Sequence, residues 1–351
     1  MMAAMRQELT SRSVELENEK IQTVYFGGGT PSLLSYEEIM QFFEVLQKHY
    51  NLDHLEEITL EANPDDFSQD FIYAIEKSPI NRLSIGIQSF FDEDLAFMNR
   101  VHSASQADRC VKLAQDKGID NITIDLIYAI PSSNMERWKK NVAQGISLHV
   151  PHISSYCMTI EEKTTFGNWE KKGKLVQVPD EKASSQYLYL VSALEDANIH
   201  QYEISNFAKP GFESKHNSNY WTGIPYLGIG PSAHSFNGKN SRRWNVSNNI
   251  SYMKKMMAGE RYHQEEVLTP RDRYNETIMT SLRTKKGVSL EHIKKEFHLD
   301  LYTSFQESIE EHLRHGLALL ENKYLRLTPQ GLFVADKIAS DLFLLEEKNE
   351  H

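Results

Sequence analysis

Short apolar segments alternate with amphipathic segments along the first two-thirds of the chain. The apolar segments are "QTVYF", "EITLEAN", "RLSIGIQSF", "NITIDLIYAIP", "HISSYCMTI" and "QYEIS". Their Val, Ile, Leu and aromatic residues are typical of strands buried on both faces of a sheet. We expect helices between them near residues 35–50, 67–77, 104–117, 135–148 and 180–197. This alternation predicts parallel strands with right-handed crossovers, either in a doubly wound sheet or in a barrel.

Two of the expected helices follow a serine that lies three residues before a glutamate. The pairs are Ser35 with Glu38 and Ser133 with Glu136. This spacing is that of the capping box, in which each side chain accepts a hydrogen bond from a free backbone N–H group at the helix start. We therefore expect helices to begin just after Ser35 and just after Ser133.

The pattern changes in the last third of the chain. Residues 209–269 are rich in Gly, Ser, Asn and Pro with aromatic residues between them, which predicts an ordered but irregular connecting region. From residue 270 onward we expect a winged-helix-like module. Its helices are expected at 270–282, 289–297 and 303–321. The predicted domains are therefore residues 1–208, 209–269 and 270–351.

Composition and charge narrow the functional classes. The 351 residues carry a net charge of −11, which argues against a broad nucleic-acid-binding face. The C-terminal module has no basic excess either. No apolar run approaches the roughly 18 residues that span a bilayer, and the first residues do not resemble a signal peptide. We expect a cytoplasmic protein without membrane insertion and without a nucleic-acid partner.

Polar residues recur near the ends of the predicted strands. They are Glu61, Gln88, Asp125, Tyr156 and Glu203, and the glycines after "VYF" occupy the same relative position. The carboxyl ends of parallel strands meet at one rim, where α/β proteins bind their ligands. We therefore expect one site at that rim. The alternative is that each residue is a local cap or a buried, hydrogen-bonded group.

Three consecutive glycines, Gly27 to Gly29, lie between a predicted strand and a predicted helix. Such a loop can bring backbone N–H groups against an anionic or zwitterionic ligand. The Gly-Lys-Ser/Thr of a phosphate-binding loop and the G-x-G-x-x-G of a dinucleotide-binding loop are both absent. A tight turn that lets the loop pack is the alternative.

Seven motifs occur in the order "YFGGGTPS", "TLEANP", "NRLSIGIQSF", "MNRVHS", "DLIYAIP", "HNSNYW" and "YLGIGPSAHSF". Together they resemble the coproporphyrinogen-dehydrogenase-like branch of the radical S-adenosylmethionine (SAM) proteins, and within it the HemW-type heme chaperones. The resemblance covers almost the whole chain. It implies an α/β fold: a partial parallel (β/α) barrel of radical SAM type, here lacking its first strand, with a C-terminal helical winged-helix-like module.

The resemblance also implies a set of SAM-binding residues. They are Gly28, Gly29, Thr30, Glu61, Gln88, Arg100, Asp125, Cys157 and His234. Gly28, Gly29 and Thr30 would face the aminoacyl end of SAM. The residue types suit the ligand, because Glu61 and Asp125 can pair with cationic and hydroxyl groups. Arg100 offers a planar fork for a carboxylate.

The defining motif of the family, C-x-x-x-C-x-x-C, does not occur in the chain. Its three thiolates hold a [4Fe–4S] cluster, whereas this sequence has two cysteines, Cys110 and Cys157, in unrelated segments. We expect no metal site and no normal cluster in the chain as given. Either its first strand and cluster loop precede Met1 in the complete protein or the cluster has been lost. The intact rim residues favour the first explanation.

The resemblance leaves three functions open. The first is a heme chaperone that binds heme and SAM and passes the heme to acceptor proteins. The second is an oxygen-independent coproporphyrinogen III oxidase of porphyrin biosynthesis, which would need an N-terminal extension and a further cysteine. The third is a degenerate, non-catalytic binding module. Among the histidines, His216 and His234 are the first candidates for heme binding, because they lie near the aromatic segment.

Overall fold

A computed structural model describes residues 1–345 except residues 163 and 174. Its main sheet has seven strands in the order β1-β2-β3-β4-β5-β7-β6. They are β1 (Thr23–Phe26), β2 (Glu57–Ala62), β3 (Arg82–Gln88), β4 (Ile122–Tyr128), β5 (His152–Cys157), β6 (His200–Gln201) and β7 (Asn206–Ala208). The first five are parallel, as the sequence predicts.

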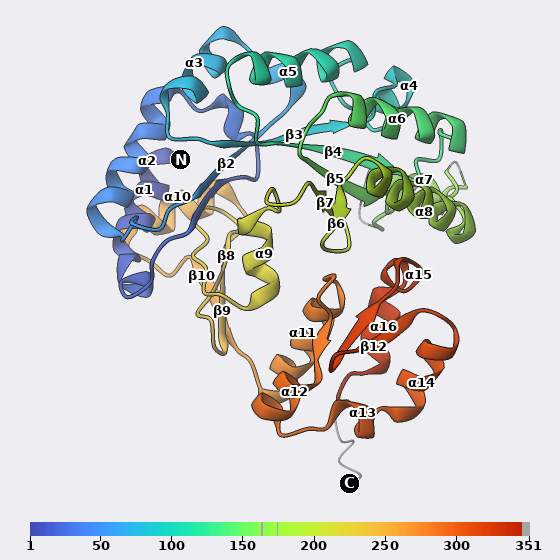
Figure 1. Ribbon diagram of the computed structural model, residues 1–351. Coiled ribbons are helices and arrows are strands. Elements are labelled where there is room, and N and C mark those ends of the chain that lie inside the picture. The colour runs from blue at the N-terminus through green and yellow to red at the C-terminus, as the bar shows by residue number, and fades with distance from the viewer. Residues whose placement is uncertain (163, 174, 346–351) are drawn as a thin grey trace.

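Helices cover the outer side of this sheet (Figure 1). They are α2 (Tyr36–His49), α3 (Gln69–Lys77), α5 (Ala104–Asp116), α6 (Met135–Ser147) and α8 (Asp180–Asp196), close to the expected ranges. Shorter elements at the strand ends are η2 (Pro31–Leu33), η3 (Pro64–Asp66), α4 (Asp92–Phe97) and α7 (Thr165–Lys171). This arrangement agrees with a partial barrel and not with a doubly wound sheet.

The two predicted capping boxes have different outcomes. Ser35 and Glu38 form a complete capping box at the start of α2. The prediction for Ser133 is wrong, because α6 is capped by the next residue, Asn134. The side chain of Asn134 accepts a hydrogen bond from the backbone N–H of Arg137 at 2.9 Å.

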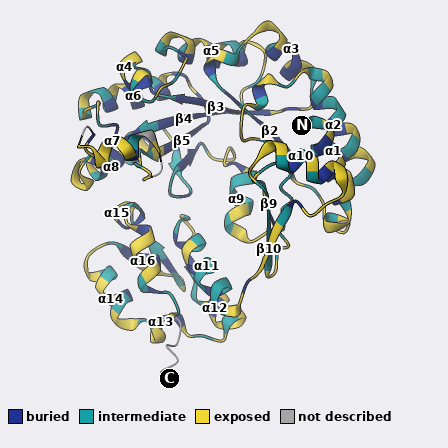
Figure 2. Ribbon diagram, turned by 180° about the vertical axis from the view of Figure 1, so that it is seen from behind, coloured by how far each residue is buried: buried dark blue, intermediate teal, exposed yellow. Residues whose placement is uncertain are grey.

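The two faces of the sheet differ in chemistry. Side chains alternate along each strand, and the outer face is apolar, with Leu60, Leu83 and Ile124 fully buried against the helices. The inner face is polar. It carries Thr23 and Tyr25 of β1, Glu57, Thr59 and Glu61 of β2, Arg82 and Gln88 of β3, Thr123 and Asp125 of β4, and His152, Ser154 and Tyr156 of β5. The strands are therefore largely buried, as expected (Figure 2), but only one face is apolar.

The segment "QYEIS" is not a regular strand of the parallel set. Strand β6 ends at Gln201, and Glu203 forms an isolated bridge with Thr284 instead. The chain then reverses, so that β7 runs antiparallel to both β5 and β6. The expected parallel pairing is wrong at this edge of the sheet.

The prediction of an irregular region over residues 209–269 is also wrong for about half of its length. The segment contains α9 (Lys215–Thr222), β8 (His234–Phe236), β9 (Ser241–Asn245), α10 (Asn249–Ala258) and β10 (His263–Val267). The three strands form an antiparallel sheet in the order β10-β9-β8, called the second sheet below. Helix α9 packs beside β1, at the edge of the main sheet.

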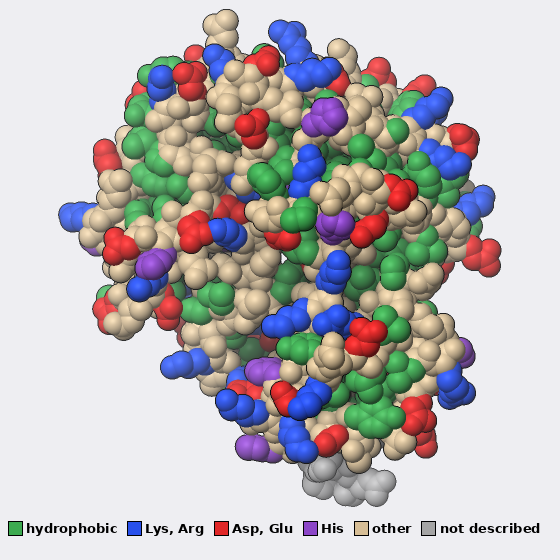
Figure 3. Space-filling model, viewed as in Figure 1, with side chains coloured by type: hydrophobic (Ala, Val, Ile, Leu, Met, Phe, Trp, Pro, Cys, Tyr) green, Lys and Arg blue, Asp and Glu red, His purple; other side chains and the backbone are tan. Residues whose placement is uncertain are grey.

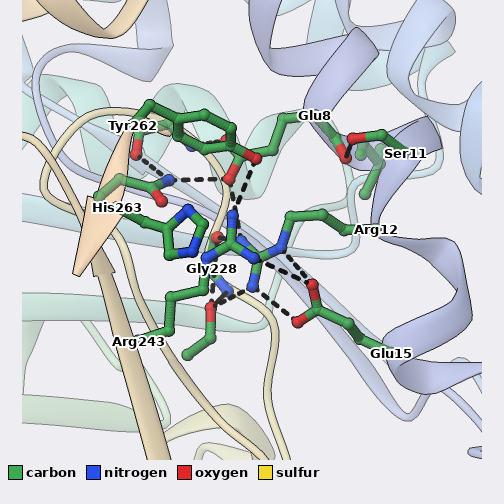
Figure 4. A network of polar contacts seen from close by, with 12 residues as sticks. Glu8, Ser11, Arg12, Glu15, Gly228, Arg243, Tyr262 and His263 are labelled. Carbon is green, nitrogen blue, oxygen red and sulfur yellow. Dashed lines mark hydrogen bonds and ion pairs between the residues drawn. The ribbon is translucent and has the colours of Figure 1, made fainter. Parts of the chain in front are cut away.

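The first helix, α1 (Met2–Ser11), is followed by η1 (Ser13–Leu16) and contacts both α2 and α10. Glu8 of this helix is fully buried and forms an ion pair with Arg12 at 2.9 Å. Arg12 also donates hydrogen bonds to the Gly228 carbonyl at 2.9 Å and to Ser235 Oγ at 3.0 Å. Figure 4 shows Glu8 and Arg12 within a polar network that joins α1 to the second sheet.

The C-terminal module is a separate group of short elements (Figure 1). They are α11 (Pro270–Leu282), β11 (Val288–Ser289), α12 (Leu290–Phe297), α13 (Leu301–Ser304), α14 (Gln306–Arg314), β12 (Ala318–Glu321), β13 (Tyr324–Leu327), α15 (Pro329–Phe333) and α16 (Ala335–Asp341). The helix expected over 303–321 is wrong, because α14 ends at Arg314 and Gly316 takes a φ of 68°. Strand β12 lies within the segment expected to be helical and pairs with β13 in an antiparallel hairpin.

The surface shows no separation of charge on the face seen in Figure 3, where acidic and basic side chains are interspersed with apolar ones. Among the residues that the structure describes, no helix has the length and apolar character needed to cross a membrane.

Candidate functional site

The glycine loop follows β1 and lies against the inner face of β2. A Cβ atom on Gly27 would lie 2.5 Å from the Tyr25 ring and 2.9 Å from Glu61 Oε1, so a side chain there would displace Tyr25 or Glu61. Gly28 and Gly29 have φ angles of 75° and 68°, which glycine adopts most readily. Their outer side is open space. The exposed Thr30 follows directly, at the start of η2.

Glu61 connects this loop to the sheet. Its Oε1 accepts a hydrogen bond from the Tyr25 hydroxyl at 2.8 Å, and its Oε2 accepts one from the Gly28 backbone N–H at 3.0 Å. Burial and the neighbouring Glu61 carboxylate raise the pKa of Tyr25 far above its ordinary value. The hydroxyl of Tyr25 therefore remains a hydrogen-bond donor at physiological pH.

Arg100 and Gln88 meet above Gly86 of β3. A Cβ atom on Gly86 would lie 3.0 Å from both Arg100 Nη2 and Gln88 Nε2. Arg100 Nη2 donates to the Gly86 carbonyl at 3.3 Å, and Gln88 has a φ of 67°, which is uncommon for a residue other than glycine. Arg100 Nε is buried and has no hydrogen-bond partner among the described residues. A buried donor without a partner is costly, so this position suits an acceptor supplied by a ligand.

Asp125 lies on the same inner face, two strands from Glu61. Burial and, secondly, the charge of Glu61 raise its pKa to about 7, against the opposing effects of Ser154, Arg82 and Arg100. Asp125 is therefore only partly ionised near neutral pH. A cationic ligand group beside it would favour the charged form.

The structure thus brings together five of the residues expected in the site: Gly28, Glu61, Gln88, Arg100 and Asp125. Two further residues of the predicted rim are Tyr156, on β5, and Glu203, in the segment between β6 and β7. Tyr156 is 44% exposed at the end of β5, whereas Glu203 is only 1% exposed. Burial raises the pKa of Glu203 to about 7.

Cys157 and His234 are not part of this group. Cys157 pairs in register with Tyr128. Tyr128 packs on Trp138 and Tyr187, so Cys157 belongs to the outer, helix-covered face. His234 belongs to the second sheet, where its ring stacks on Trp244 with a centroid separation of 6.2 Å. It lines a pocket of about 340 Å³ formed by residues of that sheet and the segment before α10.

His216, at the start of α9, lies against β1. Its ring stacks on Tyr25 at a centroid distance of 4.8 Å and an interplanar angle of 24°. Its Nδ1 lies 2.8 Å from Thr23 Oγ1, and its Nε2 lies 3.2 Å from the Tyr220 hydroxyl. Burial lowers the pKa of His216 to about 4, so the imidazole is neutral at physiological pH.

Sequence reasoning missed Tyr25, which contacts both Glu61 and His216. The only signal was its position two residues before Gly27, which places it on the inner face of β1. An aromatic residue in a strand is so common that this position alone does not mark a functional residue.

The residues present do not fit an iron–sulfur cluster. Cys110 is 1% exposed in α5, and burial raises its thiol pKa to about 12. Cys157 is on the outer face of the main sheet. Among the described residues, no group of three His, Cys, Asp or Glu side chains is arranged to hold a metal ion.

Comparison with known proteins places the chain in a family. Residues 7–143 match the radical SAM superfamily, and residues 268–334 match the HemN C-terminal domain. The heme chaperone HemW of Lactococcus lactis is 33% identical over 333 residues, which cover 95% of this chain and 87% of that protein. This chain belongs to the HemW family.

Other relatives agree with this assignment. HemW of Bacillus subtilis is 31% identical over 337 residues, which cover 95% of this chain and 89% of that protein. Among solved structures, the coproporphyrinogen III oxidase HemN of Escherichia coli superimposes with a TM-score of 0.81 at 20% identity. That match covers 97% of this chain and 82% of HemN. It confirms the expected radical SAM fold with its C-terminal helical module.

Proposed function

We propose that this member of the HemW family is a heme chaperone that binds heme and SAM and delivers the heme to acceptor proteins. The names of the relatives support the heme-related role. The observation that carries the proposal in this chain is His216, a neutral imidazole held in place by β1 with one nitrogen directed toward the exposed ring of Tyr220.

The contacts of His216 suit an iron ligand. In the tautomer with its proton on Nδ1, the ring donates to Thr23 Oγ1, and Nε2 keeps its lone pair. Metal-binding histidines usually donate their other N–H group in this way. Heme iron would take the place of the Tyr220 hydroxyl at Nε2. His234 is the second candidate, because its imidazole is exposed and stacked on Trp244.

The inner-face group suits SAM. The carboxylates of Glu61 and Asp125 would bind its ammonium and hydroxyl groups, and the free Nε–H of Arg100 would donate to its carboxylate. Gln88 and the open backbone of Gly28, Gly29 and Thr30 would complete the contacts. When bound, SAM supplies a sulfonium group with activated carbon–sulfur bonds. The residues of this chain orient it and hold its charged ends.

Heme titration followed by the absorption band tests this proposal. We expect saturable binding to the wild-type chain, and His216→Ala should weaken it at least about tenfold, the change that corresponds to 1.4 kcal/mol. His315→Ala is the matched control, because His315 is exposed and follows α14 in the C-terminal module. Absence of saturable binding would reject the heme role. If His216→Ala binds heme as tightly as the wild type and His234→Ala binds it more weakly, the iron ligand is His234.

A further inference from the structure

Strand β2 presents two carboxylates on the inner face, four residues apart. Glu57 is 5% exposed and accepts hydrogen bonds from the backbone N–H groups of Lys215 at 2.8 Å and His216 at 3.0 Å. It therefore satisfies free donors at the start of α9 and fixes the position of His216 relative to the sheet. Glu61, further along the same strand, holds Tyr25 and the glycine loop.

Tyr25 connects these two positions, because it contacts both Glu61 and His216. Its hydroxyl donates to Glu61 at 2.8 Å, while its ring stacks on His216 at 4.8 Å. Gly27 lies beside the ring, and a Cβ atom on it would come within 2.5 Å of the ring. A single side chain thus contacts both the carboxylate at the proposed SAM site and the histidine proposed to bind heme.

We propose that Tyr25 is a positioning residue that couples ligand binding at Glu61 to the ability of His216 to bind iron. This inference rests on the proposed function. An ammonium group that binds Glu61 competes with the Tyr25 hydroxyl for the same oxygen. Release of the hydroxyl lets the ring shift, and because the ring is stacked on His216, the imidazole changes its contacts with Thr23 and Tyr220. By thermodynamic reciprocity, iron binding at His216 changes the affinity at Glu61 by the same factor.

A purely structural role for Tyr25 predicts something different. If the ring only fills space beneath His216, removal of its hydroxyl should have the same effect whether or not Glu61 is present. A coupling role requires that the effect of changing Glu61 on His216 pass through that hydroxyl. The two roles can therefore be separated by a double-mutant cycle.

The experiment uses four versions of the full chain: wild type, Tyr25→Phe, Glu61→Ala and the double variant. The first readout is the set of imidazole ¹⁵N resonances of His216 without heme. We expect Glu61→Ala to shift these resonances in the wild-type background and to leave them unchanged in the Tyr25→Phe background. Equal shifts in both backgrounds would overturn the proposal. If Glu61→Ala fails to fold, Glu61→Gln takes its place.

The second readout is the dissociation constant for heme in the same four proteins. We expect the two substitutions to be non-additive by about threefold or more. Additive effects would count against the coupling. If no version binds heme, the heme role fails, and the ¹⁵N resonances still decide whether Tyr25 connects Glu61 to His216. Tyr73→Phe is the matched control, since Tyr73 is 52% exposed on α3, and it should move neither readout.

Discussion

The fold moves the pKa of Asp125 from its ordinary value of 3.8 to about 7, mainly by burial. The folded chain then holds a proton at Asp125 over a pH range in which the unfolded chain has released it. Folding takes up this proton between the two pKa values, so stability falls as the pH rises through that window. Above the window Asp125 is charged in both states and contributes its full destabilisation.

Substitution of Asp125 by Asn tests this effect. The variant cannot ionise, so we expect its melting temperature to exceed that of the wild type at pH 8. The difference should shrink toward pH 5, where the folded wild type holds the proton. Thermal unfolding followed by circular dichroism across this range measures the effect. Asp53→Asn is the control, because Asp53 is exposed. An equal pH profile in Asp125→Asn and the wild type would contradict the raised pKa.

The residues of the candidate site can be predicted only as far as the alternation of side chains along each strand shows which of them face inward. Glu61, Gln88 and Asp125 lie on one face near one rim, as expected, because parallel strands repeat the same alternation of side chains and end on the same side of the sheet. Cys157, which only the resemblance implies, lies on the outer face beside Tyr128. Its neighbour Tyr156, which this alternation predicts, is the inward residue. Tyr25 was missed because its role arises from contacts with residues 36 and 191 positions later in the chain, which no local pattern contains.

At the scale of secondary-structure elements, helix starts depend on single capping side chains. The side chain of Ser35 accepts from the Glu38 backbone, and Glu38 accepts from the Ser35 backbone at 3.1 Å. At α6 the corresponding cap belongs to Asn134 and not to Ser133. The two serines occur in the same sequence pattern but have different roles in the structure.

We expect Ser35→Ala to lower the free energy of unfolding by about 1 kcal/mol, the usual contribution of such a cap. Ser133→Ala is the matched comparison and should change it by less than about 0.5 kcal/mol. Chemical denaturation of both variants measures the difference. A cost for Ser133→Ala as large as that for Ser35→Ala would show that Ser133 stabilises the start of α6 despite the geometry.

The prediction of helices and strands is correct where burial of one face makes the hydrophobic residues repeat at a regular spacing. It is wrong where the sequence has no such repeat. The five parallel strands and their helices have large apolar faces, so the spacing of their hydrophobic residues can be recognised in the sequence. Strands β8 to β10 are short and carry charged residues, so their composition is that of a loop. At β12, Leu319 and Leu320 are 45% and 38% exposed, and this pair resembles the end of a helix as much as a strand.

At the scale of the whole molecule, Glu8 holds α1 against the second sheet. It is fully buried and accepts hydrogen bonds from four donors. They are Arg12 Nη1 at 2.9 Å, the Gly230 N–H at 2.9 Å, Asn245 Nδ2 at 2.8 Å and the Tyr252 hydroxyl at 2.5 Å. Removal of this carboxylate would leave Arg12 as a buried charge without its innermost partner.

We expect Glu8→Ala to destabilise the protein by about 3–5 kcal/mol, as for other buried ion pairs that lose one member. Glu15→Ala removes the second carboxylate bound to Arg12, but Glu15 is 37% exposed, so its loss should cost about 1 kcal/mol or less. Equilibrium unfolding in denaturant measures both. Similar costs for the two variants would show that the buried network does not hold the two parts together.

The Glu8 network has a consequence for synthesis on the ribosome. Glu8 is translated 244 residues before its partner Tyr252. Until that part has left the exit tunnel, the helix that carries Glu8 cannot reach its final environment, and the carboxylate must stay hydrated. Docking of this helix is therefore delayed until the segment that carries Gly230, Asn245 and Tyr252 has been translated. A nascent chain stalled before residue 228 should leave that helix accessible to proteases.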